Sequence, residues 1–366
     1  MSVDLNHGAT EIDSANKSQA SQGLIIQTYC QSVKSQPAVN FAGYDNLKRY
    51  EQDINTGLGQ AKAHADTYIN VIQPTIITNI SNISNYYAMQ NAIPVVLPAG
   101  ATSERWLQIL ATLEKMATAH KATADATVTA LNGLYNNLTE DAGSFTDTVG
   151  KLNSAVNGDN GVISSINDQL KDIQSRIDGT IAGVVVSGLA IVGGVFLTAV
   201  GGIAEFVTAG TSTPLVVLGV AITLAGVGGA VAAGLALKGL YDSKARLLTD
   251  KSRLSDEVGL ALGISQGFSG LSNQVQGAVT AALQMSKAWN ILSSDLGTVA
   301  DDIRQGRLST DDARTLFLTA ANSQVQQVTQ DISIIKGQMT GVTNLEPMPN
   351  RNIKDIIDDL ERRVVA

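Results

Sequence analysis

The 366-residue sequence predicts an all-α protein, in which long helices form an elongated bundle with an inserted hydrophobic helical hairpin. Three observations predict this fold. Between Ala99 and Glu346 the only proline is Pro214, so long helices can form on either side of it. Apolar residues recur at spacings of three and four, and no sustained period-two alternation indicates a sheet domain. The apolar content is also concentrated, because residues 179–237 hold one charged residue, Glu205, in 59 positions.

The expected elements are taken in chain order. Helices are predicted over 16–36, 44–91 and 104–155, and, after the hairpin, near 238–303 and 309–340. Residues 93–98 (IPVVLP) and the following PAG are expected to form a rigid connector, and 156–161 a second break. The last two long helices are joined around Gly306, and Ser309 with the acidic pair after it is typical of a helix start. A short amphipathic piece, 352–364, follows.

Helical periodicity is clearest in four rows of residues at spacings of mostly three and four, which we call seams. They predict helices that pack along their length. The first is Trp106, Leu110, Leu113, Ala117, His120, Ala124, Thr127, Leu131, Leu134 and Leu138. The second is Ile163, Ile166, Leu170, Ile173 and Ile177, and the third is Leu240, Leu247, Leu254 and Val258. The fourth is Phe317, Ala321, Val325, Val328, Ile332, Ile335 and Met339.

The uncharged segment divides into two arms, 181–204 and 214–237, around a polar turn. Each arm would be about 36 Å long as a helix, which is enough to cross a hydrocarbon core of about 30 Å. The apolar residues expected to enter a bilayer are Ile181, Val184, Val185, Val186, Leu189, Ile191, Val192, Val195, Phe196, Leu197, Val200, Ile203, Leu215, Val216, Val217, Leu218, Val220, Ile222, Leu224, Val227, Val231, Leu235 and Leu237.

The tip and the small residues of this hairpin have their own expected roles. The tip comprises Glu205, Phe206, Gly210, Thr211 and Pro214, with Pro214 at the first position of the second helix. Small residues at four-residue spacing would let the two helices pack closely in lipid. They are Ala190, Gly194, Gly202, Ala221, Ala225, Gly229 and Ala233. An ionised Glu205 would oppose crossing by roughly 2.5–3.5 kcal/mol.

These elements define three parts of the chain. Residues 1–178 and 238–366 would form one bundle, the stalk, and residues 179–237 a membrane-inserting head. The head also holds 13 of the 34 glycines. Since glycine favours the helix weakly, the segment could adopt one conformation in water and another in lipid, and its helical or extended state before insertion stays open.

Composition excludes several classes of function. A net charge of −8 and a pI near 4.9 argue against nucleic-acid binding, which needs a basic surface. A single cysteine and three histidines without paired spacing indicate no disulfide framework and no metal site. No nucleophile elbow, dinucleotide fingerprint or P-loop is present. We therefore expect no enzyme activity, no catalytic residues and no cofactor.

Three classes of function remain compatible with these residues. The first is a soluble bundle that converts so that its hairpin enters a bilayer. The second is a resident two-span membrane protein, such as a sensor or anchor, with coiled-coil domains. The third is a helical scaffold with a very apolar hairpin. Basic residues flank both arms, in KDIQSRIDGT and KGLYDSKARLL, which gives the second class weak support.

A long helical bundle with an uncharged Gly/Ala/Val-rich hairpin in mid-chain resembles the α-helical pore-forming toxins. These are the cytolysin A superfamily, which includes the haemolysin BL and non-haemolytic enterotoxin components. The chain is most similar to the B component of the Gram-negative tripartite haemolysins. This resemblance implies a haemolytic, secreted virulence protein that inserts the hairpin into the target-cell bilayer, self-associates in the pore and works with companion A- and C-type components.

Two further expectations concern secretion and the pore. The first 16 residues show no basic or apolar signal-peptide region, so secretion would use a route without a recognisable signal peptide. Within the arms the polar side chains are only Ser187, Thr198 and Thr223, widely separated. Because neither arm has a continuous polar face, we hypothesise that a second protein with an amphipathic hairpin lines the conducting pore.

Overall fold

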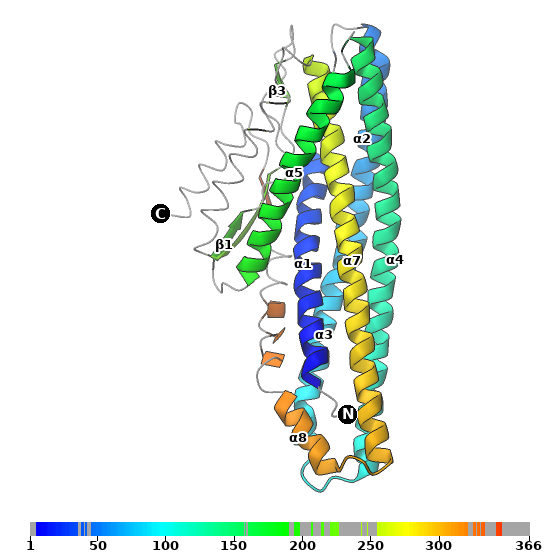
Figure 1. Cartoon of the computed structure of the whole chain (residues 1–366), viewed down its shortest axis with the longest axis vertical. Helices are drawn as coiled ribbons and strands as arrows, with labels where there is room; N and C mark the ends of the chain where they lie inside the picture. The colour runs from blue at the N-terminus through cyan, green and yellow to red at the C-terminus, as the bar shows by residue number, and fades with distance from the viewer. Residues whose placement is uncertain are drawn as a thin grey trace. The chain divides into compact units, whose positions relative to one another are not determined.

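The computed structural model consists mainly of long α-helices (Figure 1). It describes residues 5–35, 38–39, 41, 45–156, 158, 160–189, 194–197, 206–207, 214–215, 220–226, 243, 247, 255–320, 325–326, 328–329, 331–333 and 342–345. The helices are α1 (Leu5–Ser35), α2 (Lys48–Thr67), α3 (Gln73–Val96), α4 (Ser103–Ala155), α5 (Asn160–Leu189), α7 (Asp256–Arg304) and α8 (Thr310–Ala320). A 3-10 turn, η1 (Asp45–Leu47), precedes α2, and a π-helical turn, η2 (Tyr68–Ile72), joins α2 to α3.

The chain folds into two compact units. The first unit comprises Met1–Gly23, Ile72–Leu131 and Gly277–Met339. The second unit comprises Leu24–Val71, Asn132–Gln276 and Thr340–Ala366. Helices α1, α4 and α7 each contribute residues to both units, which is why each unit is assembled from three separate stretches of sequence.

The first unit is a bundle with an aromatic core. Trp289 of α7 is fully buried, and its ring lies edge-on to Tyr86 of α3, with centroids 5.4 Å apart. The imidazole of His120 of α4 lies 4.8 Å from the same indole. Near the start of α4, Trp106 packs against Phe317 of α8, with centroids 5.7 Å apart. Rings from α3, α4, α7 and α8 therefore hold these helices together.

Replacing Trp289 by alanine is expected to destabilise the protein strongly. The indole is fully buried against Tyr86 and His120, so its loss leaves a cavity that the surrounding helices cannot fill. Such substitutions cost about 3–5 kcal/mol. Urea denaturation followed by circular dichroism measures the change. The exposed Leu283→Ala substitution on the same helix is the control, and equal midpoints for the two variants would contradict the assigned core.

The second unit packs parts of α1, α2, α4, α5 and α7 together. Phe145 of α4 stacks on Phe268 of α7, with centroids 4.6 Å apart and the planes 11° from parallel. Tyr29 of α1 lies against Gly270 of α7, where an added Cβ would come within 2.9 Å of the tyrosine oxygen. Asn167 of α5 accepts a hydrogen bond from Gln266 of α7. The absence of a side chain at Gly270 thus permits the close approach of α1 and α7.

Local residue chemistry explains where several helices begin and end. The hydroxyl of Ser309 accepts a hydrogen bond from the amide of Asp312 at 3.1 Å, which caps α8 as predicted. Gly306 has φ +68° in the turn between α7 and α8, a conformation that glycine adopts without strain. Pro74 lies in the first turn of α3, directly after the π turn, where its missing N–H is tolerated.

The first two seams are confirmed over most of their described residues, and the helix predicted over 104–155 is confirmed as α4. The helix predicted over 16–36 begins earlier, at Leu5, and the one predicted over 44–91 is interrupted by η2. All of Trp106, Leu110, Leu113, Ala117, Ala124, Thr127, Leu131, Leu134 and Leu138 are buried, as are Ile163, Ile166, Leu170 and Ile173. The predicted rigid connector at 93–98 is wrong in its first part, since α3 continues through Pro94 to Val96. A single proline near a helix end removes only one backbone hydrogen bond, so the last turn persists. The predicted piece at 352–364 lies outside the described residues.

Candidate functional site

The first arm of the apolar segment begins as a continuation of α5. This helix runs to Leu189, so Ile181, Val184, Val185, Val186 and Leu189 are helical. The chain then forms a short strand, β1 (Gly194–Leu197). The second arm contains β4 (Val220–Gly226), which pairs with β1 in the antiparallel direction. The two arms therefore meet as extended chains.

The register between β1 and β4 brings predicted residues together. Phe196 lies opposite Thr223, Leu197 opposite Ile222, and Gly194 opposite Gly226. Between the Gly194–Gly226 pair and the Phe196–Thr223 pair the register shifts by one residue, which is the signature of a β-bulge in β4. Pairing between the arms satisfies backbone groups that a Gly-rich segment would satisfy poorly as an isolated helix in water.

Two short strands flank the predicted tip. Strand β2 (Phe206–Val207) pairs antiparallel with β3 (Pro214–Leu215), with Phe206 opposite Leu215 and Val207 opposite Pro214. Pro214 was predicted to open a helix but is the first residue of a strand, a position where its missing N–H is also tolerated.

A third strand joins the sheet from the C-terminal part of the chain. Strand β5 (Val342–Leu345) pairs antiparallel with β4, which places Ala221 opposite Asn344 and Ile222 opposite Thr343. The order is β1-β4-β5, so β4 is the middle strand. Nothing in the sequence analysis anticipated β5, which lies just beyond the helix predicted over 309–340.

The sequence left the helical or extended state of the arms before insertion open, and in this structure residues 194–197, 206–207, 214–215 and 220–226 are extended. One signal in the sequence could have revealed β4. The larger side chains Val220, Ile222 and Leu224 alternate there with the smaller Ala221, Thr223 and Ala225. This period-two pattern and the β-branched residues favour a strand. The alternation is short and lies within a long apolar segment, where it is easily taken for part of a helix.

The other predicted residues of the segment lie outside the described residues. From the predicted inserting set these are Ile191, Val192, Val200, Ile203, Val216, Val217, Leu218, Val227, Val231, Leu235 and Leu237. From the tip they are Glu205, Gly210 and Thr211, and from the close-packing set Ala190, Gly202, Gly229 and Ala233. Of the described residues, Val195 is in β1, and Val220, Leu224, Ala221 and Ala225 are in β4.

Two other kinds of site, a membrane-spanning helix and a metal-binding cluster, are absent from the described residues. Within them, no helix combines the length and the apolar character that crossing a membrane requires. The same part of the chain contains no group of three or more His, Cys, Asp or Glu side chains arranged to hold a metal ion.

One hydrogen-bonded side-chain pair that the sequence analysis missed connects α2 and α4. His64 Nδ1 and Asp141 Oδ2 lie 2.6 Å apart, and the Asp141 side chain is almost completely buried. Burial raises the pKa of Asp141, and the hydrogen bond with His64 opposes that shift. The two residues are 77 positions apart, so only the tertiary fold brings them together. We assign this pair to the packing of α2 against α4.

His120 makes the stability of the first unit sensitive to pH. Burial lowers the pKa of this half-buried imidazole below its ordinary value of 6.5, so the folded state favours the neutral ring. As the pH falls below about 6.5, the unfolded state takes up the proton first and stability decreases. We expect the free energy of unfolding to fall less between pH 7.5 and about 5 in His120→Phe than in the native protein. Parallel pH curves from urea denaturation would contradict this.

Comparison with protein-family models places residues 6–180 in the Bacillus haemolytic enterotoxin (HBL) family. No curated protein matches the chain. Among solved structures, soluble AhlB of the tripartite α-pore-forming toxin AHL from Aeromonas hydrophila is 46% identical. The match has a TM-score of 0.89 and covers 96% of this chain and 99% of AhlB. Soluble SmhB of the toxin Smh from Serratia marcescens is 39% identical, with a TM-score of 0.89, 97% of this chain covered and 99% of SmhB.

A third match has similar sequence identity but a different conformation. The pore form of AhlB is 42% identical to this chain, and the match covers 92% of this chain and 99% of AhlB. Its TM-score is only 0.64. Identity changes little between the soluble and pore forms of AhlB, whereas the TM-score falls from 0.89 to 0.64. The conformation described here is therefore that of the soluble form.

Proposed function

Since this chain belongs to the family of AhlB and SmhB, B components of tripartite α-pore-forming toxins, we propose that it inserts residues 179–237 into a target bilayer. The protein acts as a pore-forming toxin, changes conformation from a soluble form and assembles with companion components. This proposal is supported by the matches to AhlB in two states, the soluble form and the pore, each over nearly the full chain.

The proposed path of insertion follows from backbone hydrogen bonding. In the hydrocarbon core every N–H and C=O group must be satisfied, and a spanning segment of this length can do so as a helix. Residues 181–204 and 214–237 are each long enough, and α5 already supplies the first helical turns up to Leu189. We propose that β1 and β4 separate and that each arm becomes continuous helix. Residues 1–178 and 238–366 remain the water-exposed stalk.

The proposed assembly needs other proteins. The arms contain few polar side chains, so this chain would form a lipid-facing ring and an amphipathic partner would line the conducting channel. The protein would act after secretion, at the membrane of the target cell.

Dye release from liposomes tests this function directly. Protein alone is expected to bind membranes and to release little dye, and addition of A- and C-type components is expected to increase release strongly. Spin labels at Val195 and Val227 should report protein or water contact before liposomes are added and lipid contact afterwards. Full release by the protein alone would contradict the partner-lined channel, and unchanged label environments would contradict insertion of the segment.

A further inference from the structure

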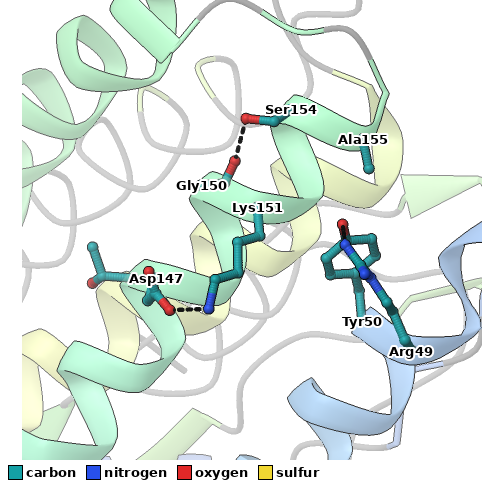
Figure 2. Close-up of a pocket in the computed structure, with 8 residues that line it drawn as sticks. Arg49, Tyr50, Asp147, Gly150, Lys151, Ser154 and Ala155 are labelled. Atoms are coloured by element: carbon teal, nitrogen blue, oxygen red, sulfur yellow. Dashed lines mark hydrogen bonds and ion pairs between the residues drawn. The ribbon is translucent and has the colours of Figure 1, made fainter.

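An open pocket in the second unit has a composition that suits an anion. It lies between the first turn of α2 and the last turns of α4 and has a volume of about 740 Å³ (Figure 2). Arg49 and Tyr50 of α2 line it, together with six residues of α4: Thr146, Asp147, Gly150, Lys151, Ser154 and Ala155. This volume is within the range of small-molecule sites, and six of the eight lining residues carry a polar or charged side chain.

The guanidinium of Arg49 is available to a ligand. It lies over the ring of Tyr50, 4.4 Å from the centroid, and donates one hydrogen bond to the Tyr50 hydroxyl. Tyr50 is itself buried and so holds the guanidinium plane in place. Among the described residues no carboxylate forms an ion pair with Arg49. Four of its five N–H donors therefore remain for a planar, bidentate acceptor.

Lys151 supplies a second cation that is only weakly engaged. It pairs with Asp147 one turn earlier on α4, and these side chains are 61% and 65% exposed. Exposed pairs of this spacing contribute little, so an incoming anion can compete for the ammonium group. Hydrogen bonding to Asp147 raises the pKa of Lys151, so its ammonium group stays charged, and it lines the same pocket as Arg49.

The hydroxyl groups of the pocket are already committed to the helix. Ser154 donates to the carbonyl of Gly150 at 3.0 Å, and Thr146 donates to the carbonyl of Ala142 at 2.9 Å. The donors left for a ligand are therefore the guanidinium and the ammonium group. Such a set recognises a compact anion with several oxygens and offers little to an uncharged sugar or an acyl chain.

We propose that this pocket binds a phosphate group, with Arg49 and Lys151 as its two cationic donors. The phosphate can belong to a phospholipid headgroup or to a soluble phosphate ester. Binding of a phospholipid headgroup rests on the proposed function, because it requires the protein to reach a bilayer. The phosphate site itself does not depend on that function.

Calorimetric titration of inorganic phosphate into the full-length protein, at low salt, tests whether the pocket binds a phosphate group from either source. Arg49→Gln with Lys151→Gln is expected to weaken binding by about tenfold or more. Asp147→Asn frees Lys151 and is expected to tighten binding several-fold. Lys121→Gln and Asp125→Asn are the matched controls, because Lys121 and Asp125 form the same i,i+4 pair on α4 outside the pocket. These controls should bind phosphate as the native protein does.

Vesicles distinguish the two sources. Phosphatidylcholine vesicles with and without phosphatidic acid are sedimented with the native protein and the same variants. Retention that depends on phosphatidic acid, falls in the double variant and is competed by inorganic phosphate identifies a headgroup. Phosphate binding without such retention identifies a soluble ester.

Two outcomes would overturn the proposal. One is no phosphate binding by the native protein, and the other is equal binding by the native and double-variant proteins. If the double variant does not fold, as judged by circular dichroism, the comparison of Asp147→Asn with Asp125→Asn decides alone, and equal affinities reject the site. Failure of dye release would reject the proposed function and leave the calorimetric result unaffected.

Discussion

A disulfide between β4 and β5 is expected to abolish pore formation, and its reduction is expected to restore it. Ala221 and Asn344 lie directly opposite each other, so cysteines at both positions are close enough to bridge. A residue of β4 cannot pair with β5 and also form the internal hydrogen bonds of a membrane-spanning helix. The cross-link therefore holds the soluble conformation. Dye release with companion components, before and after addition of reductant, measures the effect.

The chain offers good controls for this experiment. Ile222→Cys with Thr343→Cys links the next pair along, and one of the two adjacent pairs has the closer side chains of a non-hydrogen-bonded position. Each single-cysteine variant should release dye normally under oxidising conditions. The native Cys30 is fully buried, and burial raises the pKa of its thiol, so it does not compete for oxidation. A fully cross-linked protein that still released dye at the native rate would contradict the required separation of β4 from β5.

A charge near the middle of an arm is expected to reduce lysis by about two orders of magnitude. Val227 lies close to the centre of 214–237, and an arginine at the centre of a spanning helix costs about 2.5–3.5 kcal/mol. Since about 1.4 kcal/mol corresponds to a factor of ten, Val227→Arg should lower the inserted population roughly a hundredfold. Titration of liposome dye release against protein concentration measures the shift.

The matched control is Leu318→Arg, which makes the same kind of change at an exposed position of α8. This variant should lyse as the native protein does, because its new charge stays in water. Both variants should also be recovered in soluble form with native circular dichroism. If Val227→Arg lysed at the native concentration, residues 214–237 would not be a spanning segment.

Much of the helical architecture could be predicted because its cause is local. The seam from Trp106 to Leu138 repeats with helical spacing over more than 30 residues, and the structure buries it as expected. The start of α8 at Ser309 and the turn at Gly306 were also predictable, because a capping hydroxyl and a glycine with positive φ act within a few residues. These features need no knowledge of the tertiary fold.

The parts that could not be predicted depend on partners distant in sequence. Strand β5 exists because β4, more than 100 residues earlier, offers it a free edge. The His64–Asp141 contact and the phosphate pocket require α2 and α4 to lie side by side. For 181–204 and 214–237 the sequence left the conformation in water open for a different reason. Apolar residues without charge are compatible with a helix in lipid and with paired strands in water, so composition alone does not choose between them.

Because β4 is the central strand, its departure is expected to open the whole sheet at once. Among the described strands, β1 and β5 pair with β4 and with no other strand, so neither retains a partner once β4 leaves. Partial opening leaves unpaired backbone groups without completing a new helix, which makes intermediates unfavourable. Conversion should therefore follow single-exponential kinetics with a high activation barrier. Such a barrier lets the protein persist in water in a metastable state until contact with lipid lowers it.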